Sequence, residues 1–287
     1  MGSAPMMKGT VLVTGAEGFI GRHLVLRLRQ IGGCELVTTT RKGSAEVPAC
    51  DLCDLDAVTA LFRDLRPEHI FHCAGSFSNC WEADVDSNVK ASRNVLEAVT
   101  RCDLNARVLL FGSAAEYGNR LSGAIPETAP VDPVSIYGVS KAMQTAVMGY
   151  YFRERHLDVV LARTFNLYGE GISAQLFPGR VMHQIAAVKA CRQPKVVVRS
   201  IDSSRDYIEI MEAVDAYFRV MQFGNAGEIY NVGSGKPTPV KSLLEELLVE
   251  SGLSLDDVEV THAGDSREEV VSFAEISKLS ALPRLSA

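Results

Sequence analysis

The 287-residue chain has no long hydrophobic run and little excess of either charge. Its longest apolar stretches, such as Val108–Phe111 and Val159–Ala162, are far shorter than the roughly 20 residues that a membrane-spanning helix needs. Lys and Arg number 29 against 35 Asp and Glu, which gives a formal net charge of −6. Such a chain has no general attraction to nucleic acid or anionic lipid. We therefore expect a protein that binds neither nucleic acid nor membranes.

The sequence also lacks the features of exported or metal-binding proteins. Residues 1–7 contain neither the basic start nor the long apolar segment of a signal peptide. The seven cysteines, an odd number, suit reduced thiols. Cys50 and Cys53 have CxxC spacing, but no second pair or nearby His accompanies them, and the six histidines show no ligand spacing. We expect a cytoplasmic protein without a bound metal.

The sequence alternates repeatedly between short apolar runs typical of strands and segments with the apolar spacing of helices. Thr10–Thr14 is a short apolar run, after which Ile20, Leu24 and Leu28 recur every four residues. Further strands are expected at Glu35–Thr39, His69–Cys73, Arg107–Phe111 and Asp158–Arg163, and further helices at Ala57–Leu65, Val85–Val99 and Ile136–Phe152. This alternation predicts an α/β fold in which helices cover both faces of a parallel sheet.

After Tyr168 the chain has shorter elements and loops rich in Gly and Pro. Expected elements are a helix near Arg180–Cys191, strands at Lys195–Val198 and Glu228–Val232, and a helix from Val240 to Leu248. We interpret this region as a smaller lobe interleaved with the last strands of the sheet. The predicted nucleotide-binding domain is 8–167 with a returning segment at about 201–233, and the predicted lobe is 168–200 with 234–287.

A glycine-rich turn separates the first expected strand from the first expected helix. Residues 14–21 read TGAEGFIG, which places Gly15, Gly18 and Gly21 at GxxGxxG spacing. Glycines there allow a tight turn, close approach of the backbone to a pyrophosphate, and close packing of helix on strand. The helix N-terminus adds N–H groups and a favourable dipole. The sequence therefore predicts a dinucleotide cofactor at this turn.

The end of the second strand bears on which cofactor binds. About 20 residues beyond the glycines, a NAD site usually offers an acid to the adenosine ribose. Here the chain instead reads Thr39-Thr40-Arg41-Lys42. A guanidinium binds a 2′-phosphate through two hydrogen bonds, so Arg41 favours NADP(H) over NAD(H), which stays an alternative.

The segment YGVSK at 137–141 places a phenol and an ammonium four residues apart, on one face of the expected helix. A fixed cation favours phenolate, so we expect Lys141 to lower the pKa of Tyr137 from about 10 toward neutrality. Ser113 stands at the end of the preceding strand, where ligands gather in open α/β sheets. It is placed to hold a substrate oxygen while Tyr137 protonates it.

The chain resembles the extended short-chain dehydrogenases/reductases, an NAD-dependent epimerase/dehydratase-like group, in a series of motifs over most of its length. The motifs are TGAEGFIG, the Asp51–Asp54 segment, HCAG at 72–75, GSAAEYG at 112–118, YGVSK, RTFNLYG at 163–169, RDY at 205–207 and YNVG at 230–233. The resemblance implies a Rossmann-type, doubly wound parallel sheet with a smaller C-terminal substrate lobe. It also implies a homodimer formed through the helices expected at Val85–Val99 and Ile136–Phe152.

The resemblance further implies roles for individual residues, with Ser113, Tyr137 and Lys141 as the catalytic triad. Together with Arg41, the cofactor-binding positions are Gly15, Gly18, Phe19, Ile20, Gly21, Asp51, Leu52, Ala74, Tyr137 and Lys141. The substrate-binding positions are Ser76, Ser113, Asn166, Arg205 and Arg267, where the two arginines suit the diphosphate of a nucleotide sugar.

The two residues directly after Ser113 narrow the choice of reaction. Members of the family that act as 4,6-dehydratases resemble one another in an acidic pair at these positions, whereas this chain has Ala114 and Ala115. The favoured reaction is reduction of a nucleotide-diphosphate-linked 4-keto-6-deoxyhexose by NADPH, since the segments around Trp81 and 205–210 are similar to those of GDP-4-keto-6-deoxymannose reductases. Two alternatives stay open: an NDP-sugar 4-epimerase with tightly bound NAD, and a non-catalytic NADP-binding sensor or scaffold.

Overall fold

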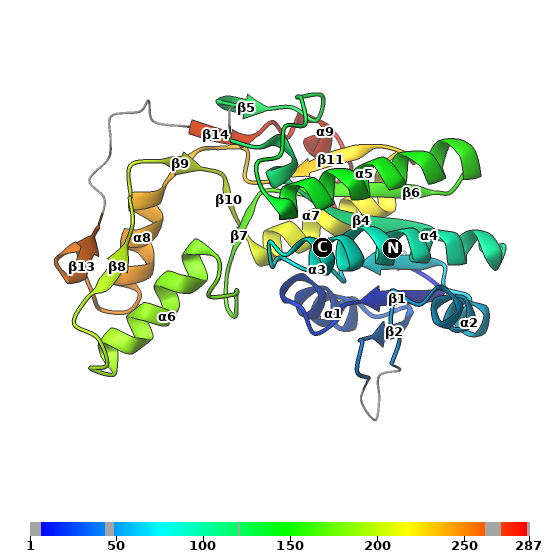
Figure 1. The fold of residues 1–287 in the computed structure, drawn as a ribbon, viewed down its shortest axis with the longest axis horizontal. Coiled ribbons are helices and arrows are strands. Elements are labelled where there is room, and N and C mark those ends of the chain that lie inside the picture. Colours follow the sequence, from blue (N-terminus) through cyan, green and yellow to red (C-terminus); the bar gives the residue numbers. More distant parts are fainter. Residues whose placement is uncertain (1–6, 44–48, 120, 262–270, 286–287) are drawn as a thin grey trace, which may run out of the picture.

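A computed structural model describes residues 7–43, 49–119, 121–261 and 271–285 of the chain (Figure 1). Its centre is a six-stranded sheet in the order β11-β6-β4-β3-β1-β2, and every pairing in it is parallel. The strands are β1 Thr10–Thr14, β2 Glu35–Thr39, β3 His69–His72, β4 Arg107–Ser113, β6 Val159–Thr164 and β11 Ile229–Val232. The predicted α/β fold with a Rossmann-type parallel sheet is confirmed.

Helices cover both faces of this sheet. One face packs against α1 Phe19–Ile31 and α7 Ile210–Phe223, and the other against α2 Leu55–Leu65, α4 Ala91–Arg101 and α5 Ile136–Arg155. Within β1, Val11 and Val13 pack toward α1 and α7, whereas Leu12 packs toward α2, α4 and α5. A parallel sheet buried on both faces requires apolar side chains in both directions, which explains the near-continuous apolar strands.

The direction in which strands are added reverses at β1, which lies between β2 and β3. The connections leaving β1 and β3 therefore diverge to opposite sides of the sheet. A crevice outside the carboxyl ends of the strands forms at such a switch point, and ligands bind there in open α/β sheets. The glycine-rich turn after β1 and the residues after His72 both lie at this edge.

The C-terminal region has its own apolar cluster, to the left in Figure 1. It packs α6 Phe177–Lys189 and β8 Val196–Val198 with α8 Val240–Val249 and β13 Val258–Val260. A small mixed sheet joins β5 Gly123–Ile125, β14 Val271–Ala274, β9 Ser204–Arg205 and β12 Thr238–Pro239, and β10 Tyr207–Glu209 pairs with β7 Asn166–Tyr168. The exact division into 8–167 with 201–233, and 168–200 with 234–287, stays a prediction.

The remaining short elements are α3 Trp81–Asp84, the π-helix η1 Val85–Lys90, the 3₁₀ helices η2 Ala114–Tyr117 and η3 Leu255–Asp257, and α9 Ser277–Ser280. The expected helix Val85–Val99 is thus a π-helix continued by α4. The sequence analysis did not predict α7, although its buried residues Ala213, Tyr217 and Val220 recur at helical spacing. Across the described ranges, no helix has the length and apolar character needed to cross a membrane.

Phe218 tests how much stability depends on α7. Its ring is fully buried and meets Phe71 of β3 edge to face, with 5.5 Å between centroids. Phe218→Ala should lower the free energy of unfolding by about 3–5 kcal/mol, because it removes a buried ring and leaves a cavity. Val249→Ala, at a side chain 71% exposed, is the matched control and should change it by less than about 0.5 kcal/mol. Urea denaturation measures both, and equal small losses would contradict this role of α7.

Candidate active site

The turn after β1 crosses the turn after β3 so closely that only glycine fits. Gly15 has φ +65°, and a Cβ built on it would lie 2.6 Å from the backbone nitrogen of Ala74. Gly21 packs on the same turn, since its Cβ would lie 2.2 Å from the carbonyl oxygen of Gly15. Gly18 donates its N–H to that carbonyl at 3.0 Å. The three predicted glycines therefore build one compact turn beside Ala74.

The N-terminus of α1 presents N–H groups to this turn. Its N-cap is Gly18, no described side chain caps it, and its first turn holds no acidic residue. Phe19 and Ile20, two of the predicted cofactor-binding residues, begin the helix. Unpaired N–H groups and the positive end of the helix dipole bind phosphate, and in a Rossmann unit this position takes the pyrophosphate of a dinucleotide. The residues present fit such a cofactor.

Three other predicted cofactor residues lie beyond the end of β2. Arg41 is exposed there, one residue after the isolated parallel bridge between Thr40 and Ala49. Asp51 is exposed and its Oδ1 accepts the N–H of Cys53 at 3.0 Å. Leu52 is buried, and its backbone carbonyl oxygen accepts a hydrogen bond from Asn94 Nδ2 at 2.9 Å.

The predicted triad converges at the carboxyl end of β4. Ser113 ends β4, and Tyr137 and Lys141 lie one turn apart on α5. The ammonium of Lys141 is buried, donates to the carbonyl oxygen of Phe111 at 2.8 Å and to Gln144 Oε1 at 3.2 Å, and lies 5.8 Å from the centre of the Tyr137 ring. The structure therefore brings together the hydroxyl, phenol and ammonium that the sequence selects.

Desolvation, rather than the neighbouring cation, controls the acidity of Tyr137. Its pKa is raised to about 12, mainly by burial and further by the charges of Glu116 and Asp84, while a hydrogen bond with Ser113 opposes the rise in part. Burial also lowers the pKa of Lys141 to about 8. The expectation that Lys141 lowers the Tyr137 pKa toward neutrality is wrong for this structure, because desolvation of the phenol is the largest influence and raises the pKa instead. Tyr137 is protonated at neutral pH.

A buried carboxylate that the sequence analysis did not assign holds Ser113. Glu116 Oε1 accepts the backbone N–H of Ser113 at 2.9 Å, and its Oε2 accepts from Thr145 Oγ1 and Arg163 Nη2, both at 2.7 Å. The side chains of Glu116 and Arg163 are 0% and 1% exposed. The signal was present in the sequence, because an acid three residues after a serine at a strand end has capping-box spacing.

A second missed feature is a stripe of buried polar residues along α3, η1 and α4. Asp84, Asn88 and Ser92 follow one another at four-residue spacing, and all three are fully buried. Such spacing puts side chains on one face of a helix, where an apolar stripe is expected. The π-helix η1 contains Asn88, and single turns of π-helix are frequent at functional sites.

The first two residues of this stripe fix the loop that covers Tyr137. The Asp84 carboxylate accepts the N–H groups of Ser78 and Asn79 at 3.0 and 2.9 Å. Asn88 binds both the N–H and the carbonyl oxygen of the predicted substrate residue Ser76, each at 2.9 Å. The loop so held places Phe77 edge to face on Tyr137, with 4.6 Å between ring centroids.

The predicted substrate residues Asn166 and Arg205 both lie beside Asp206. Asn166 Nδ2 donates to the Asp206 carbonyl at 2.8 Å, and Arg205 directly precedes it on β9. The Asp206 carboxylate, which sequence reasoning missed, is fully buried and accepts the N–H groups of Ser234, Gly235 and Ala274 at 2.7, 3.1 and 3.0 Å. Arg267 lies outside the described residues.

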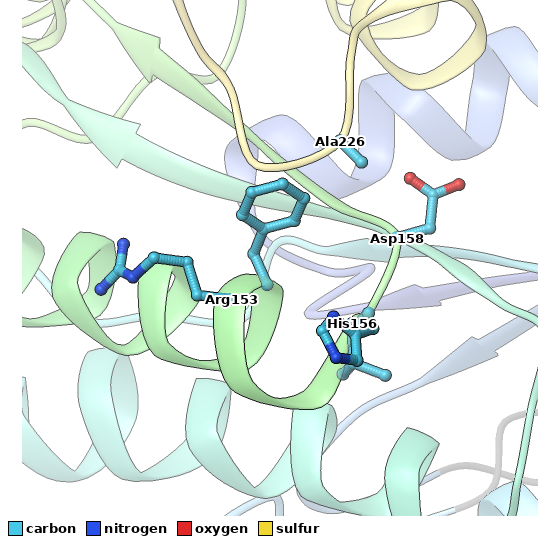
Figure 2. Close-up of a pocket in the computed structure, with 6 residues that line it drawn as sticks. Arg153, His156, Asp158 and Ala226 are labelled. Atoms are coloured by element: carbon cyan, nitrogen blue, oxygen red, sulfur yellow. The ribbon is translucent and has the colours of Figure 1, made fainter.

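A cavity of about 370 Å³ opens at the opposite edge of the sheet (Figure 2). Its lining comes from the end of α5, the turn before β6 and the loop before β11, and includes His156, Asp158 and Ala226. Asp158 precedes the first residue of β6, whereas the predicted triad lies at the carboxyl ends of the strands. This cavity is therefore separate from the candidate active site.

The profile of the NAD dependent epimerase/dehydratase family matches residues 11–233. The chain belongs to this family. It is 29% identical to GDP-6-deoxy-D-mannose reductase of Pseudomonas aeruginosa over 84% of this chain and 80% of that protein. It is 28% identical to dTDP-6-deoxy-L-talose 4-dehydrogenase (NAD(P)(+)) of Kitasatospora kifunensis, over 87% of this chain and 81% of that one.

A solved structure of similar fold is UDP-glucose 4-epimerase of Thermus thermophilus in complex with NAD. It has a TM-score of 0.79 and 26% identity, and the match covers 95% of this chain and 92% of that one. The predicted similarity to the extended short-chain dehydrogenases/reductases is thus confirmed. The prediction that the chain is an enzyme, of a family that uses a nicotinamide dinucleotide, is confirmed as well. These relatives carry the names of a reductase, a dehydrogenase and an epimerase, so family membership leaves the reaction open.

The crossing at Gly15 gives a test with a matched control. Gly15→Ala places a methyl group against the backbone of Ala74 and should weaken dinucleotide binding at least about tenfold. Gly32, at the other end of α1, has nearly the same φ of +66° but no atom within 4 Å of its Cβ position. Gly32→Ala should therefore show only backbone strain, about 1–3 kcal/mol of stability, because φ 66° with ψ −167° is a conformation adopted almost only by glycine, and binding should be unchanged. Fluorescence titration and thermal melts compare the two, and equal affinities would contradict the crossing's role.

Proposed function

We propose that the protein is an NADPH-dependent reductase of a nucleotide-diphosphate-linked 4-keto-6-deoxyhexose. The observation that carries the proposal is the protonated phenol of Tyr137 in hydrogen-bond contact with Ser113, beside the dinucleotide turn. A group with a pKa of about 12 keeps its proton at neutral pH, as a proton donor to a carbonyl must. Ala114 and Ala115 offer no acid for water elimination, which supports simple reduction over dehydration.

The side chains support this chemistry atom by atom. NADPH, when bound, would supply the hydride. Ser113 Oγ already accepts the N–H of Ala115 at 3.2 Å, so its own hydrogen is available to the substrate carbonyl oxygen. Tyr137 would give its proton to the same oxygen. Lys141 directs two of its three hydrogens to Phe111 and Gln144, and we assign the third to the nicotinamide ribose.

We assign the sugar nucleotide to the side of the crevice formed by Asn166 and Arg205, with Ser76 near the sugar. Arg205 carries a guanidinium, which suits binding of a diphosphate through two hydrogen bonds. It directly precedes Asp206, whose hydrogen bonds to Asn166 and Ser234 hold the backbone at this point. Arg267 is proposed as a second diphosphate ligand from the sequence pattern alone. The chain is further proposed to act as a homodimer through α4 and α5, since Met143 and Tyr150 leave large apolar surface exposed on α5.

Cofactor preference is tested at Arg41. If its guanidinium binds the 2′-phosphate, Arg41→Ala should weaken NADPH binding about 10- to 150-fold and leave NADH binding unchanged. Arg63→Ala removes another exposed arginine, on α2, and serves as the control. Fluorescence titrations with both cofactors give the four affinities. Wild-type protein that binds NADH at least as tightly as NADPH would contradict the preference.

The reaction is tested with an NDP-4-keto-6-deoxyhexose. The wild type should oxidise NADPH in equal amount to the sugar reduced, and Tyr137→Phe should lower kcat about 10²–10⁴-fold while NADPH still binds. A 4-epimerase would instead interconvert two NDP-hexoses without net consumption of cofactor. A sensor or scaffold would bind NADPH and turn over neither substrate. Mass spectrometry of the sugar nucleotides, with absorbance of NADPH, separates the three outcomes.

A further inference from the structure

A continuous chain of buried side chains connects Lys141 with the end of β1. Lys141 Nζ donates to Gln144 Oε1 at 3.2 Å, and Gln144 Nε2 donates to Ser92 Oγ at 2.7 Å. Ser92 Oγ is 3.1 Å from His72 Nε2, and His72 Nδ1 is 2.9 Å from Thr14 Oγ1. All five side chains are at most 6% exposed. The chain therefore crosses α5, α4, β3 and β1 without reaching water.

The hydrogens of this chain can be assigned outward from Ser92, at its middle. Ser92 has one hydrogen and donates it to the carbonyl oxygen of Asn88 at 2.7 Å. His72 must then donate from Nε2 to Ser92, so its Nδ1 is an acceptor and Thr14 Oγ1 donates to it. Burial lowers the pKa of His72 to about 3, which agrees with a neutral ring.

This assignment fixes which end of the Gln144 amide faces Lys141. The NH₂ group donates to the Ser92 hydroxyl, whose only hydrogen is already used, so the carbonyl oxygen is the end left for the ammonium. A flipped amide would place NH₂ against NH₃⁺ and leave Ser92 with a poorer partner. The other end of the chain lies beside the dinucleotide turn, because Ala74 donates its N–H to Thr14 Oγ1 at 3.4 Å.

We propose that Gln144 is a positioning residue that holds the Lys141 ammonium, charged and directed at the cofactor site, through an amide oriented by Ser92 and His72. The inference rests on the proposed cofactor role of Lys141, but not on which sugar is reduced. The proposal assigns the buried Gln144 of α5 a function beyond filling space in the protein interior. A glutamine that only filled space would not need a hydroxyl and an imidazole aligned behind it.

Other charges also face Lys141, and the test has to separate them from Gln144. Glu116 of η2 and Asp84 of α3 favour the ammonium, as does Cys73 after β3 when ionised, whereas burial opposes it. The phenol of Tyr137 stays protonated and the ring of His72 stays neutral in the neutral range. Changes at Gln144 leave all these groups in place, so an altered Lys141 titration reports on Gln144 itself.

The experiment is the affinity for NADPH and for NADH as a function of pH, measured by fluorescence from neutral into alkaline solution. In the wild type, binding should weaken as pH rises through the Lys141 pKa of about 8, because the neutral amine binds the ribose less well. Gln144→Glu puts a carboxylate against the ammonium and should move this weakening about one pH unit higher. Gln144→Leu removes the acceptor and should move it lower by a similar amount.

The controls distinguish positioning from damage to the fold. Lys141→Met should abolish the pH-dependent step, and Gln30→Glu, the same charge change at the exposed end of α1, should leave it where it is. Ser92→Ala should move the step in the direction of Gln144→Leu. Shifts of opposite sign in the two Gln144 variants support the proposal. An unmoved step, or uniformly weaker binding at every pH in folded variants, overturns it, and absence of sugar reduction would affect only the proposed function.

Discussion

The buried ion pair between Glu116 and Arg163 is the constraint on which the rest of the active site depends. Both carboxylate oxygens of Glu116 accept hydrogen bonds. One accepts the backbone N–H of Ser113, and the other accepts from Thr145 of α5 and Arg163 of β6. Arg163 also lies over the ring of Tyr117, 4.6 Å from its centre. Removal of one member of a buried pair leaves an uncompensated charge that costs about 3–5 kcal/mol, so the pair is kept or lost as a unit.

This pair joins three elements that arrive separately in the sequence. The end of β4 carries Ser113, α5 carries Tyr137 and Lys141, and β6 lies between β4 and β11. Since Glu116 touches all three, it fixes the end of β4 against α5, and with it the position of Ser113 relative to the helix that carries Tyr137. The stripe of Asp84, Asn88 and Ser92 acts similarly from the other side, so the triad lies between two sets of buried polar contacts.

Local signals in the sequence predicted the parts of the fold that depend on local physics. β1 and β2 have the predicted bounds. Each is a short apolar run that ends in Thr, and Gly15 directly after β1 marks where that strand must stop. The pair Tyr137 and Lys141 follows from spacing alone. The raised pKa of Tyr137 could not be predicted in this way, because the burial of the phenol and the nearby charge of Glu116 arise only in the folded chain. Likewise, the proposed role of Gln144 depends on its contact with Ser92, which only the folded chain brings about.

The pairing of β11 with β6 has a consequence for the order in which the molecule is assembled during synthesis. The ribosome completes β6 at Thr164 but delivers its outer neighbour, Ile229–Val232, only after the whole of α6 and α7 has been made. Until then the nascent chain exposes an unpaired strand edge and the apolar face that α7 later covers. Nascent chains stalled in this interval should therefore depend strongly on chaperones, and ribosomes that pause before codon 229 would lengthen the time at risk of aggregation.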